Sequence, residues 1–436
     1  MTGVLEKIEK DVILRTESLA TLLDIHCTND FSQQSYNYNL SIPDYQRIYC
    51  WEEKQVVKLL EDLLNYTDRE FHLGNIILHK VSNIEEHRIV DGQQRLVTLT
   101  LLLLCLDNSI KTPLLNQTFQ SNEAQNYVAY NKFLINDFCK KNPIINYKII
   151  DILKNVKLSV LIITDGNLDL AYTFFSNQNS RGKALSDFDL LKAHHLRYIL
   201  IPEQAEHLAG RWDEITLFSN QEGSLNILNQ LFGTYLFRLR KWMRKREWSN
   251  DAKFKIKNEF EAASIIPEIP AFGEQFNFNE SIQGGTHFFA YADHFIFKFK
   301  TFVETQEYKS LNKHLRYEKH WWFKEIIESL LFSYFLKFGT IYLTEALEGI
   351  GTVVSHHRYD NNRVNLKTLL KFAADTEIVM MIDQATSPTF FLAEIKDKIK
   401  SQRCSNPLAG TRERYYYAFL KINTELAATN TNFIKF

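Results

Sequence analysis

Apolar residues in the first half of the chain recur with two different spacings. Within Glu52–Tyr66 they stand three and four positions apart, which is the spacing of a helix with one buried face. Phe71–Val81 and Arg88–Val90 are instead rich in β-branched residues and flank the polar stretch Asn83–His87, which predicts two paired strands joined by a turn. Lys157–Thr164 predicts a further strand.

Three other N-terminal segments have patterns of their own. Met1–Leu23 is expected to form one or two amphipathic helices. Residues 36–51 alternate and contain Pro43, which suits an edge strand that runs into a loop. Leu96–Leu106 is almost wholly apolar and predicts a helix buried on most sides, because it is far shorter than the ~20 residues that cross a membrane.

Helical spacing dominates the remainder of the chain. Ser186 is a suitable N-cap for a helix over Asp187–Leu200, and Pro202 is expected to end it, which places a domain boundary near Ile201–His207. Ile265–Thr286 reads as an irregular connection. The clearest later helices are Ser224–Trp242, Trp321–Phe338, Leu366–Met381 and Arg412–Leu426.

These patterns predict an α+β fold in two domains. Residues 1–203 are expected to form a small mixed sheet with helices, and residues 204–436 a mostly α-helical domain.

Composition narrows the classes of function. The net charge of −1 provides no overall field that attracts DNA, so any nucleic-acid contact needs a local basic surface. The five cysteines are scattered without a CxxC pair, which argues against a zinc site or a disulfide framework and indicates reduced thiols in a cytoplasm. The N-terminus has no secretory signal pattern.

The segment Ile89–Arg95, with the sequence IVDGQQR, carries the strongest chemical signal. A predicted strand turns at Asp91-Gly92 directly into a helix, so free N–H groups and the positive end of the helix dipole point at one place. Arg95 in the first helical turn adds a bidentate donor for phosphate. The pattern indicates a phosphate or nucleotide site.

Two further polar segments accompany this turn. Tyr45-Gln46-Arg47 is followed by Tyr49 and Trp51, and a later block has Asn179, Gly182, Leu185, Ser186, Asp189, Leu190 and Lys192. With Gly74, Ile76 and Asp91–Leu96, these blocks resemble the N-terminal domain family of GmrSD-type restriction systems, which carries a DGQQR motif and is considered similar to the ParB and sulfiredoxin folds. The resemblance covers about Ile42–His194.

The resemblance implies a nucleoside-triphosphate-binding and hydrolysing module of bacterial defence against foreign or modified DNA. Asp91, Gln93, Gln94 and Arg95 would then be the catalytic residues. Mg²⁺ with the nucleotide is the implied cofactor, with Asp91 as its ligand, directly or through water. Gln93 or Gln94 would orient the attacking water. The implied nucleotide-binding residues are Arg47, Gly92, Arg95 and Asn179.

Each of these residues also has a structural interpretation. Asp91 suits a helix cap, and Arg47 suits a surface ion pair. Tyr45 and Trp51 suit core packing, Asn179 a turn, and Lys192 with His194 and His195 ordinary positions on a packed helix. Only for the DGQQR turn as a whole does the functional interpretation clearly prevail.

A second basic feature lies in Arg238–Trp248. Arg238, Arg240, Lys241, Arg244, Lys245 and Arg246 crowd nine positions with two interleaved tryptophans. This pattern predicts either the solvated end of a helix or a contact with the DNA backbone.

A nuclease signature is not convincing in the second half. Val353–Asn365 contains His356 and His357 but lacks the flanking strands of a ββα-metal nuclease. The leading hypothesis is therefore a nucleotide-hydrolysing subunit that acts on DNA with a separate nuclease. The alternatives are a non-catalytic nucleotide- or DNA-binding scaffold and a DNA endonuclease.

Overall fold

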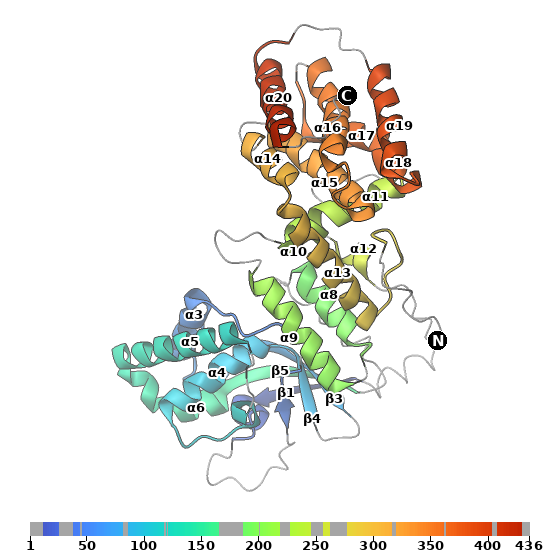
Figure 1. Ribbon diagram of the computed structural model, residues 1–436. Helices are drawn as coiled ribbons and strands as arrows, with labels where there is room; N and C mark the ends of the chain where they lie inside the picture. The colour runs from blue at the N-terminus through green and yellow to red at the C-terminus, as the bar shows by residue number, and fades with distance from the viewer. Residues whose placement is uncertain are drawn as a thin grey trace, which may run out of the picture. The chain divides into compact units, whose positions relative to one another are not determined.

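The computed structural model describes residues 12–25, 38–43, 46–81, 86–116, 119, 121–164, 186–199, 201–218, 227–245, 256–261, 277–315, 320–361, 363–402 and 408–429. The chain divides into two compact units, Met1–Leu217 and Phe218–Phe436. Figure 1 labels their helices and strands. The predicted division into a mixed α+β part and a mostly helical part is confirmed.

The first unit is built on a five-stranded mixed sheet with the order β1-β5-β3-β4-β2. Its strands are β1 (Val12–Ser18), β2 (Leu40–Ser41), β3 (Phe71–Val81), β4 (Glu86–Asp91) and β5 (Val156–Thr164). β3 pairs antiparallel with β4 and parallel with β5. The strands predicted at Phe71–Val81, Arg88–Val90 and Lys157–Thr164 are thus confirmed, and β2 occupies the predicted edge position.

One face of the sheet carries the main hydrophobic core. Ile76, Leu78 and Ile89 alternate onto this face and pack against the helices that cover it. Figure 1 shows α4, α5 and α6 together on this side. The helices of this layer are α2 (Leu19–Leu22), α3 (Glu53–Tyr66), α4 (Gln93–Leu106), α5 (Asn122–Lys141) and α6 (Ile149–Asn155), with short 3₁₀ turns at Pro113–Asn116 and Pro143–Tyr147.

The opposite face of the sheet has a smaller apolar cluster. Ile77, Val90 and Ile163 pack there against Ala193 of α8 (Asp187–Leu196). Ser186 caps α8 as predicted, in a reciprocal capping box with Asp189. Burial of both faces explains why β3, β4 and β5 have apolar residues at adjacent positions.

The N-terminal prediction was wrong over its described part. Val12–Ser18 forms strand β1, antiparallel to β5, and only Leu19–Leu22 is helical. Helical and strand spacing are hard to separate in so short a segment, and pairing with β5 decides the outcome.

Pro202 begins helix α9 (Pro202–Phe218) and does not end the helix before it, which already stops at Leu196. Helix α9 has almost all its residues in the first unit, whereas the predicted boundary at 203 assigns it to the second. Proline is well suited to a first helical turn, where its missing N–H has no partner to lose.

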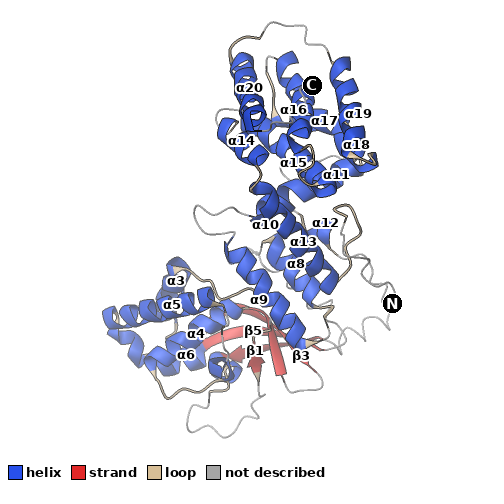
Figure 2. Cartoon of the chain, viewed as in Figure 1, coloured by secondary structure: helices blue, strands red, loops and turns tan. Residues whose placement is uncertain are grey.

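All the regular secondary structure among the described residues of the second unit is helical, and Figure 2 shows no strand there. Helix α15 (Trp321–Phe338) has the predicted bounds. The predicted helix Leu366–Met381 is interrupted at Glu377, which has a positive φ of 56°. The other helices are α10 (Ile227–Gln230), α11 (Phe237–Met243), α12 (Lys257–Phe260), α13 (Thr286–Val303), α14 (Gln306–His314), α16 (Leu343–Asp360), α17 (Leu366–Asp375), α18 (Ile378–Gln384), α19 (Pro388–Ser401) and α20 (Thr411–Thr429), with a π-helical segment at Leu231–Leu236.

Candidate functional site

The DGQQR turn joins β4 to α4 through Gly92. This glycine has a φ of 96°, in the left-handed region, and occupies the N-cap position of α4. A Cβ at this position would lie 2.1 Å from Ile76 Cδ1. Gly92 has no side chain with which to cap the helix, and no acidic residue lies in the first turn of α4. The N–H groups of a first helical turn have no acceptors within the helix, so the start of α4 is a suitable place for an anion.

Asp91 lies at the end of β4 beside two arginines. Its Oδ2 is 4.0 Å from an Arg95 guanidinium nitrogen, and its side chain is 23% exposed. Burial raises the pKa of Asp91, and the charges of Arg95 and Arg47 and a hydrogen bond from the Gly92 N–H only partly oppose this rise. Because Gly92 occupies the N-cap position, the capping interpretation of Asp91 does not apply.

Arg95 is anchored on an irregular part of β3. One guanidinium nitrogen donates to the Leu73 carbonyl at 3.1 Å and the other to the Asn75 carbonyl at 2.6 Å. The residue between them, Gly74, has a φ of 120° and lies where the register of β3 against β5 shifts. Burial lowers the pKa of Arg95, while Asp91 opposes the decrease. Arg95 thus holds the β3 backbone in addition to standing beside the turn.

The two glutamines of the motif have different environments. Gln94 Oε1 accepts from the Cys50 N–H at 2.9 Å, and Gln94 Nε2 donates to the Ile48 carbonyl at 3.0 Å. Gln94 is therefore used as a bridge to the segment that follows Arg47. Gln93 is 4% exposed, and its Oε1 has no hydrogen-bond donor among the described residues. A buried acceptor without a donor is unusual and favours a bound water or ligand.

The predicted segment Tyr45-Gln46-Arg47 meets the DGQQR turn through its described residues. Gln46 Nε2 donates to the Val90 carbonyl at 2.7 Å, and the next residue, Arg47, is close enough for its charge to lower the pKa of Asp91. Lys192, from the later predicted block that ends at this residue, donates from its Nζ to the Gln46 carbonyl at 3.2 Å. Asn179, Gly182 and Leu185 lie outside the described residues, as does Tyr45.

Tertiary structure adds three neighbours of the turn that the sequence did not assign to the nucleotide site. Gln46 is 7% exposed and Lys192 is 1% exposed. Asp213 of α9 pairs with Lys192 at 2.8 Å. Gln46 and Lys192 belong to the sequence blocks described above, but nothing in the sequence signals that Asp213 is their neighbour.

The aromatic residues after Arg47 are structural. Tyr49 is fully buried, and its hydroxyl contacts Thr98 Oγ1 at 2.8 Å and accepts from Asn131 at 3.0 Å. Trp51 packs against the main core, and its carbonyl accepts from Asn131. Base stacking by either ring is not indicated.

The basic segment of the second unit is largely internal. Arg238 and Arg240 are 0% and 2% exposed. Arg238 donates to Ser329 and Glu325, whereas Arg240, Lys241 and Arg244 all pair with Glu259. The expectation of one DNA-facing surface is therefore wrong for Arg238 and Arg240, because buried charges require partners within the fold. Lys245 pairs with Glu377 at 2.9 Å, and Arg246 lies outside the described residues.

His356 and His357 lie in α16, not in a metal-binding loop. His356 pairs with Asp360 one helical turn away at 2.9 Å, and His357 stacks on Phe372. In the described part of the chain, no three His, Cys, Asp or Glu side chains are grouped to hold a metal ion. A helix at this position differs from the strands that a ββα-metal site needs.

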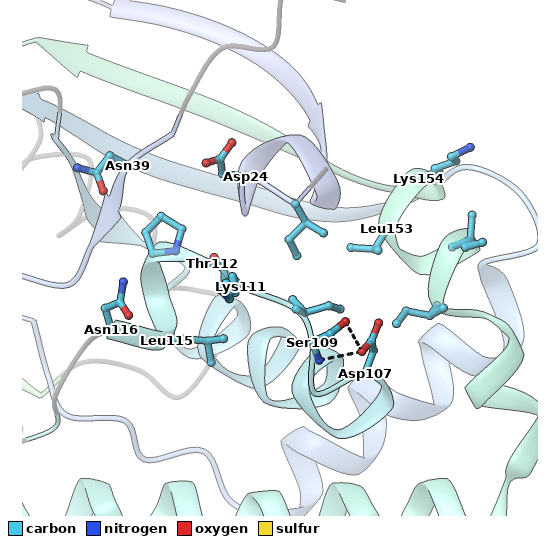
Figure 3. Close-up of a pocket in the computed structure, with 15 residues that line it drawn as sticks. Asp24, Asn39, Asp107, Ser109, Lys111, Thr112, Leu115, Asn116, Leu153 and Lys154 are labelled. Carbon is cyan, nitrogen blue, oxygen red and sulfur yellow. Dashed lines mark hydrogen bonds between the residues drawn. The ribbon is translucent and has the colours of Figure 1, made fainter. Parts of the chain in front are cut away.

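A separate cavity lies at the other end of α4. It has a volume of about 1160 Å³ and is bounded by the segment after α4 and by α6. Figure 3 shows Asp107, Lys111 and Thr112 on one side, with Asp24 and Leu153 across the cavity. None of the residues predicted for the nucleotide site lines it. This cavity is therefore distinct from the DGQQR turn.

Comparison with family models supports the family resemblance that the sequence blocks indicated. A model described as the GmrSD restriction endonuclease, N-terminal domain, matches residues 28–196. Over residues 28–196 the chain is therefore similar to the N-terminal domain of this restriction-endonuclease family. A second model, described as a family of unknown function (DUF7834), matches residues 204–408. No curated protein matches the chain.

Among the described residues, no helix combines the length and apolar composition that a membrane crossing requires.

Proposed function

We propose that the chain is a nucleotide-binding and nucleotide-hydrolysing subunit of a bacterial DNA-restriction or anti-phage system. The observation that carries the proposal is that Asp91, Gly92 and Gln93 form the turn into the N-terminus of α4, where the charge of Arg47 acts on Asp91 and the buried Gln93 Oε1 has no donor among the described residues. The similarity of residues 28–196 to a restriction-system family supports the biological setting.

The donors of the site suit a polyphosphate. The first-turn N–H groups of α4 carry partial positive charge and the guanidinium of Arg47 is positive, so both favour a bound phosphate. Arg95 contributes charge, but two of its N–H donors are already used on β3. Its principal role is therefore to hold the turn against the sheet.

Asp91 is the carboxylate that would hold Mg²⁺. This ion commonly binds through one or two carboxylates together with phosphate oxygens and water, so a single carboxylate beside a phosphate site is a suitable donor set. Bound Mg²⁺ would neutralise phosphate charge. Asp91 must be ionised for this role.

Gln93 is the better candidate of the two glutamines for orienting water. Its Oε1 has no donor among the described residues and can accept a hydrogen bond from a water molecule, but it cannot bind a phosphate oxygen, since both atoms are acceptors. Gln94 already uses its oxygen and its nitrogen on the backbone of residues 48 and 50. We therefore assign the water to Gln93 and a structural role to Gln94.

The test is turnover of ATP, GTP, CTP and UTP by the purified full chain with Mg²⁺. Arg47→Ala and Gln93→Met are expected to lower kcat/KM at least about 10²-fold, as loss of one preorganised group does in other enzymes. Arg69→Ala is the control, because Arg69 is an exposed arginine of the same unit between α3 and β3.

The matched glutamine variant separates function from folding. Gln94→Met leaves two backbone groups without partners and is expected to destabilise the first unit by about 1–3 kcal/mol. Gln93→Met removes no partner of Oε1 and should retain the wild-type melting temperature. Equal turnover by wild type and Gln93→Met would refute the assignment, and tight binding without turnover would indicate a non-catalytic module.

The proposal includes DNA and a separate nuclease as partners, on the basis of the family. The interior positions of Arg238 and Arg240 remove the strongest sequence argument for a DNA surface in the second unit. Co-purification with a nuclease from the native host would test the second partner. Stimulation of nucleotide turnover by DNA would test DNA as a partner.

A further inference from the structure

Lys192 is an almost completely buried cation between two structural elements. Its side chain is 2% exposed, and its Nζ lies 2.9 and 2.8 Å from the two carboxylate oxygens of Asp213. A buried ammonium is stable only when its charge and its donors are satisfied. Asp213 balances the charge, and the Gln46 carbonyl accepts a further hydrogen bond at 3.2 Å.

The carbonyl that Lys192 binds belongs to the residue directly before Arg47. Gln46 is also held from β4, because its Nε2 donates to the Val90 carbonyl. On the other side of Arg47, the Ile48 carbonyl accepts from Gln94. The backbone of Arg47 is thus held at both neighbouring residues by buried or half-buried bonds, which restricts where its guanidinium can reach.

We propose that the ion pair between the buried Lys192 and the partly exposed Asp213 positions Arg47 in the candidate nucleotide site, through the Gln46 carbonyl that Lys192 holds. Lys192 is a positioning residue and does not contact the ligand. The role in nucleotide turnover rests on the proposed function, whereas the role in holding the Arg47 segment does not.

Asp213 makes this arrangement depend on a later part of the chain. It lies in α9, beyond the residues matched by the GmrSD N-terminal model and within those matched by the second family model. The counter-charge for a residue of one family segment is therefore supplied by the other. A change in α9 that withdraws Asp213 would leave Lys192 charged and unpaired beside Gln46.

A second ion pair of the same unit provides a matched control. Lys148 Nζ also binds a carboxylate and a backbone carbonyl, those of Asp68 and Leu64, at 2.8 and 2.9 Å. Its side chain is 13% exposed. This pair has similar chemistry and joins the segment before α6 to the end of α3. The carbonyl that it holds, that of Leu64, is not next to a residue of the candidate site.

The experiment uses full-length Lys192→Met/Asp213→Asn, in which no unpaired charge remains. Hydrogen exchange of residues 46–51 is expected to increase at least about tenfold relative to wild type. The control Lys148→Met/Asp68→Asn should leave exchange there unchanged. Unchanged exchange in the Lys192 variant would overturn the proposal, whether or not the chain hydrolyses nucleotide.

Nucleotide kinetics then test the link to Arg47. The Lys192 double variant is expected to lower kcat/KM about tenfold in the wild-type background and to have no further effect in the Arg47→Ala background, because coupled residues are not additive. Equal effects in both backgrounds would overturn the action through Arg47. If the wild-type chain shows no turnover, the proposed function fails, and the exchange measurement alone decides the positioning role.

If the double variant does not fold, Asp213→Glu and Asp213→Asn replace it. Asp213→Glu keeps the charge and is expected to retain most of the protection of residues 46–51, whereas Asp213→Asn should lose it. Equal protection in these two variants would contradict the proposal.

Discussion

At the scale of single residues, the members of the DGQQR motif differ in their hydrogen-bond partners. Among the described residues, the buried Gln93 Oε1 has no donor, while Gln94 and Arg95 are hydrogen-bonded to backbone groups of other segments. A motif read from sequence treats its five residues alike. Their partners in space assign them different tasks.

Gly92 is expected to tolerate no side chain. In Gly92→Ala, a residue at φ 96° would carry a Cβ 2.1 Å from Ile76 Cδ1, so both the backbone conformation and the contact are unfavourable. Unfolding experiments should show a loss of at least about 2 kcal/mol. Gly339→Ala is the control, since Gly339 also has a positive φ but no atom within 4 Å of the added Cβ, and it should lose only about 1 kcal/mol.

Asp91→Asn is expected to separate stability from activity. The folded pKa of Asp91 lies above its unfolded value, so ionisation costs stability, and stability falls as pH rises from the unfolded value through the folded one. At pH 7 the variant should therefore melt at or above the wild-type temperature and lose Mg²⁺-dependent turnover. The difference in melting temperature should shrink towards pH 4. A variant that melts well below wild type at pH 7 would contradict this account.

At the scale of elements, the basic helix α11 shows how a sequence pattern can mislead. Clustered arginines and lysines suggest a surface for nucleic acid, but one carboxylate, Glu259, binds three of them and joins α12 to α11. The side chain of Glu259 is 4% exposed. The cations stabilise a helix contact and are not arranged around an external ligand.

Glu259→Gln is expected to destabilise the second unit in a pH-dependent way. Burial alone would raise the pKa of Glu259, but hydrogen bonds from Arg240 and Lys241 outweigh it and lower the pKa. The stabilisation is therefore present above the unfolded pKa and is lost as pH falls through the lower folded pKa.

Urea unfolding should show a loss of about 3–5 kcal/mol at pH 7 and much less near pH 3. The control Glu304→Gln removes an exposed pair with Lys309 and should cost under about 1 kcal/mol. Equal losses for Glu259→Gln at both pH values would contradict the account.

At the scale of the whole molecule, the division between the two units affects the candidate site. The sequence places the boundary near residue 203, and the second family model begins at 204. The contacts within the chain divide it after Leu217, so α9 packs with the first unit. This helix contributes the buried Trp212 and the partly exposed Asp213 to that unit.

A fragment of residues 1–217 is therefore expected to be more stable than one of residues 1–203. The shorter fragment lacks nearly all of α9, and with it the buried Trp212 and the carboxylate that pairs with Lys192, which is expected to cost about 3–5 kcal/mol. Calorimetry of both fragments would measure the difference. Equal melting temperatures would show that α9 is not required by the first unit.

Sequence patterns by themselves determined much of this protein. Periodicity and turn residues predicted β3, the β3–β4 pair, β5, α3, α4 and the cap at Ser186, since these features depend on near neighbours along the chain. The ordered blocks around Arg47, Asp91–Leu96 and Ser186–Lys192 indicated the family and the place of the candidate site. Amino-acid spacing records such local and repeated constraints directly.

Tertiary structure alone decided which partners these residues have. It paired Lys192 with Asp213, left the Gln93 oxygen without a donor among the described residues, and placed Arg238 and Arg240 in the interior. It also made Val12–Ser18 a strand, because β5 offers a free edge to pair with. Burial and side-chain pairing depend on groups distant in sequence, and no local pattern specifies which distant group will be adjacent.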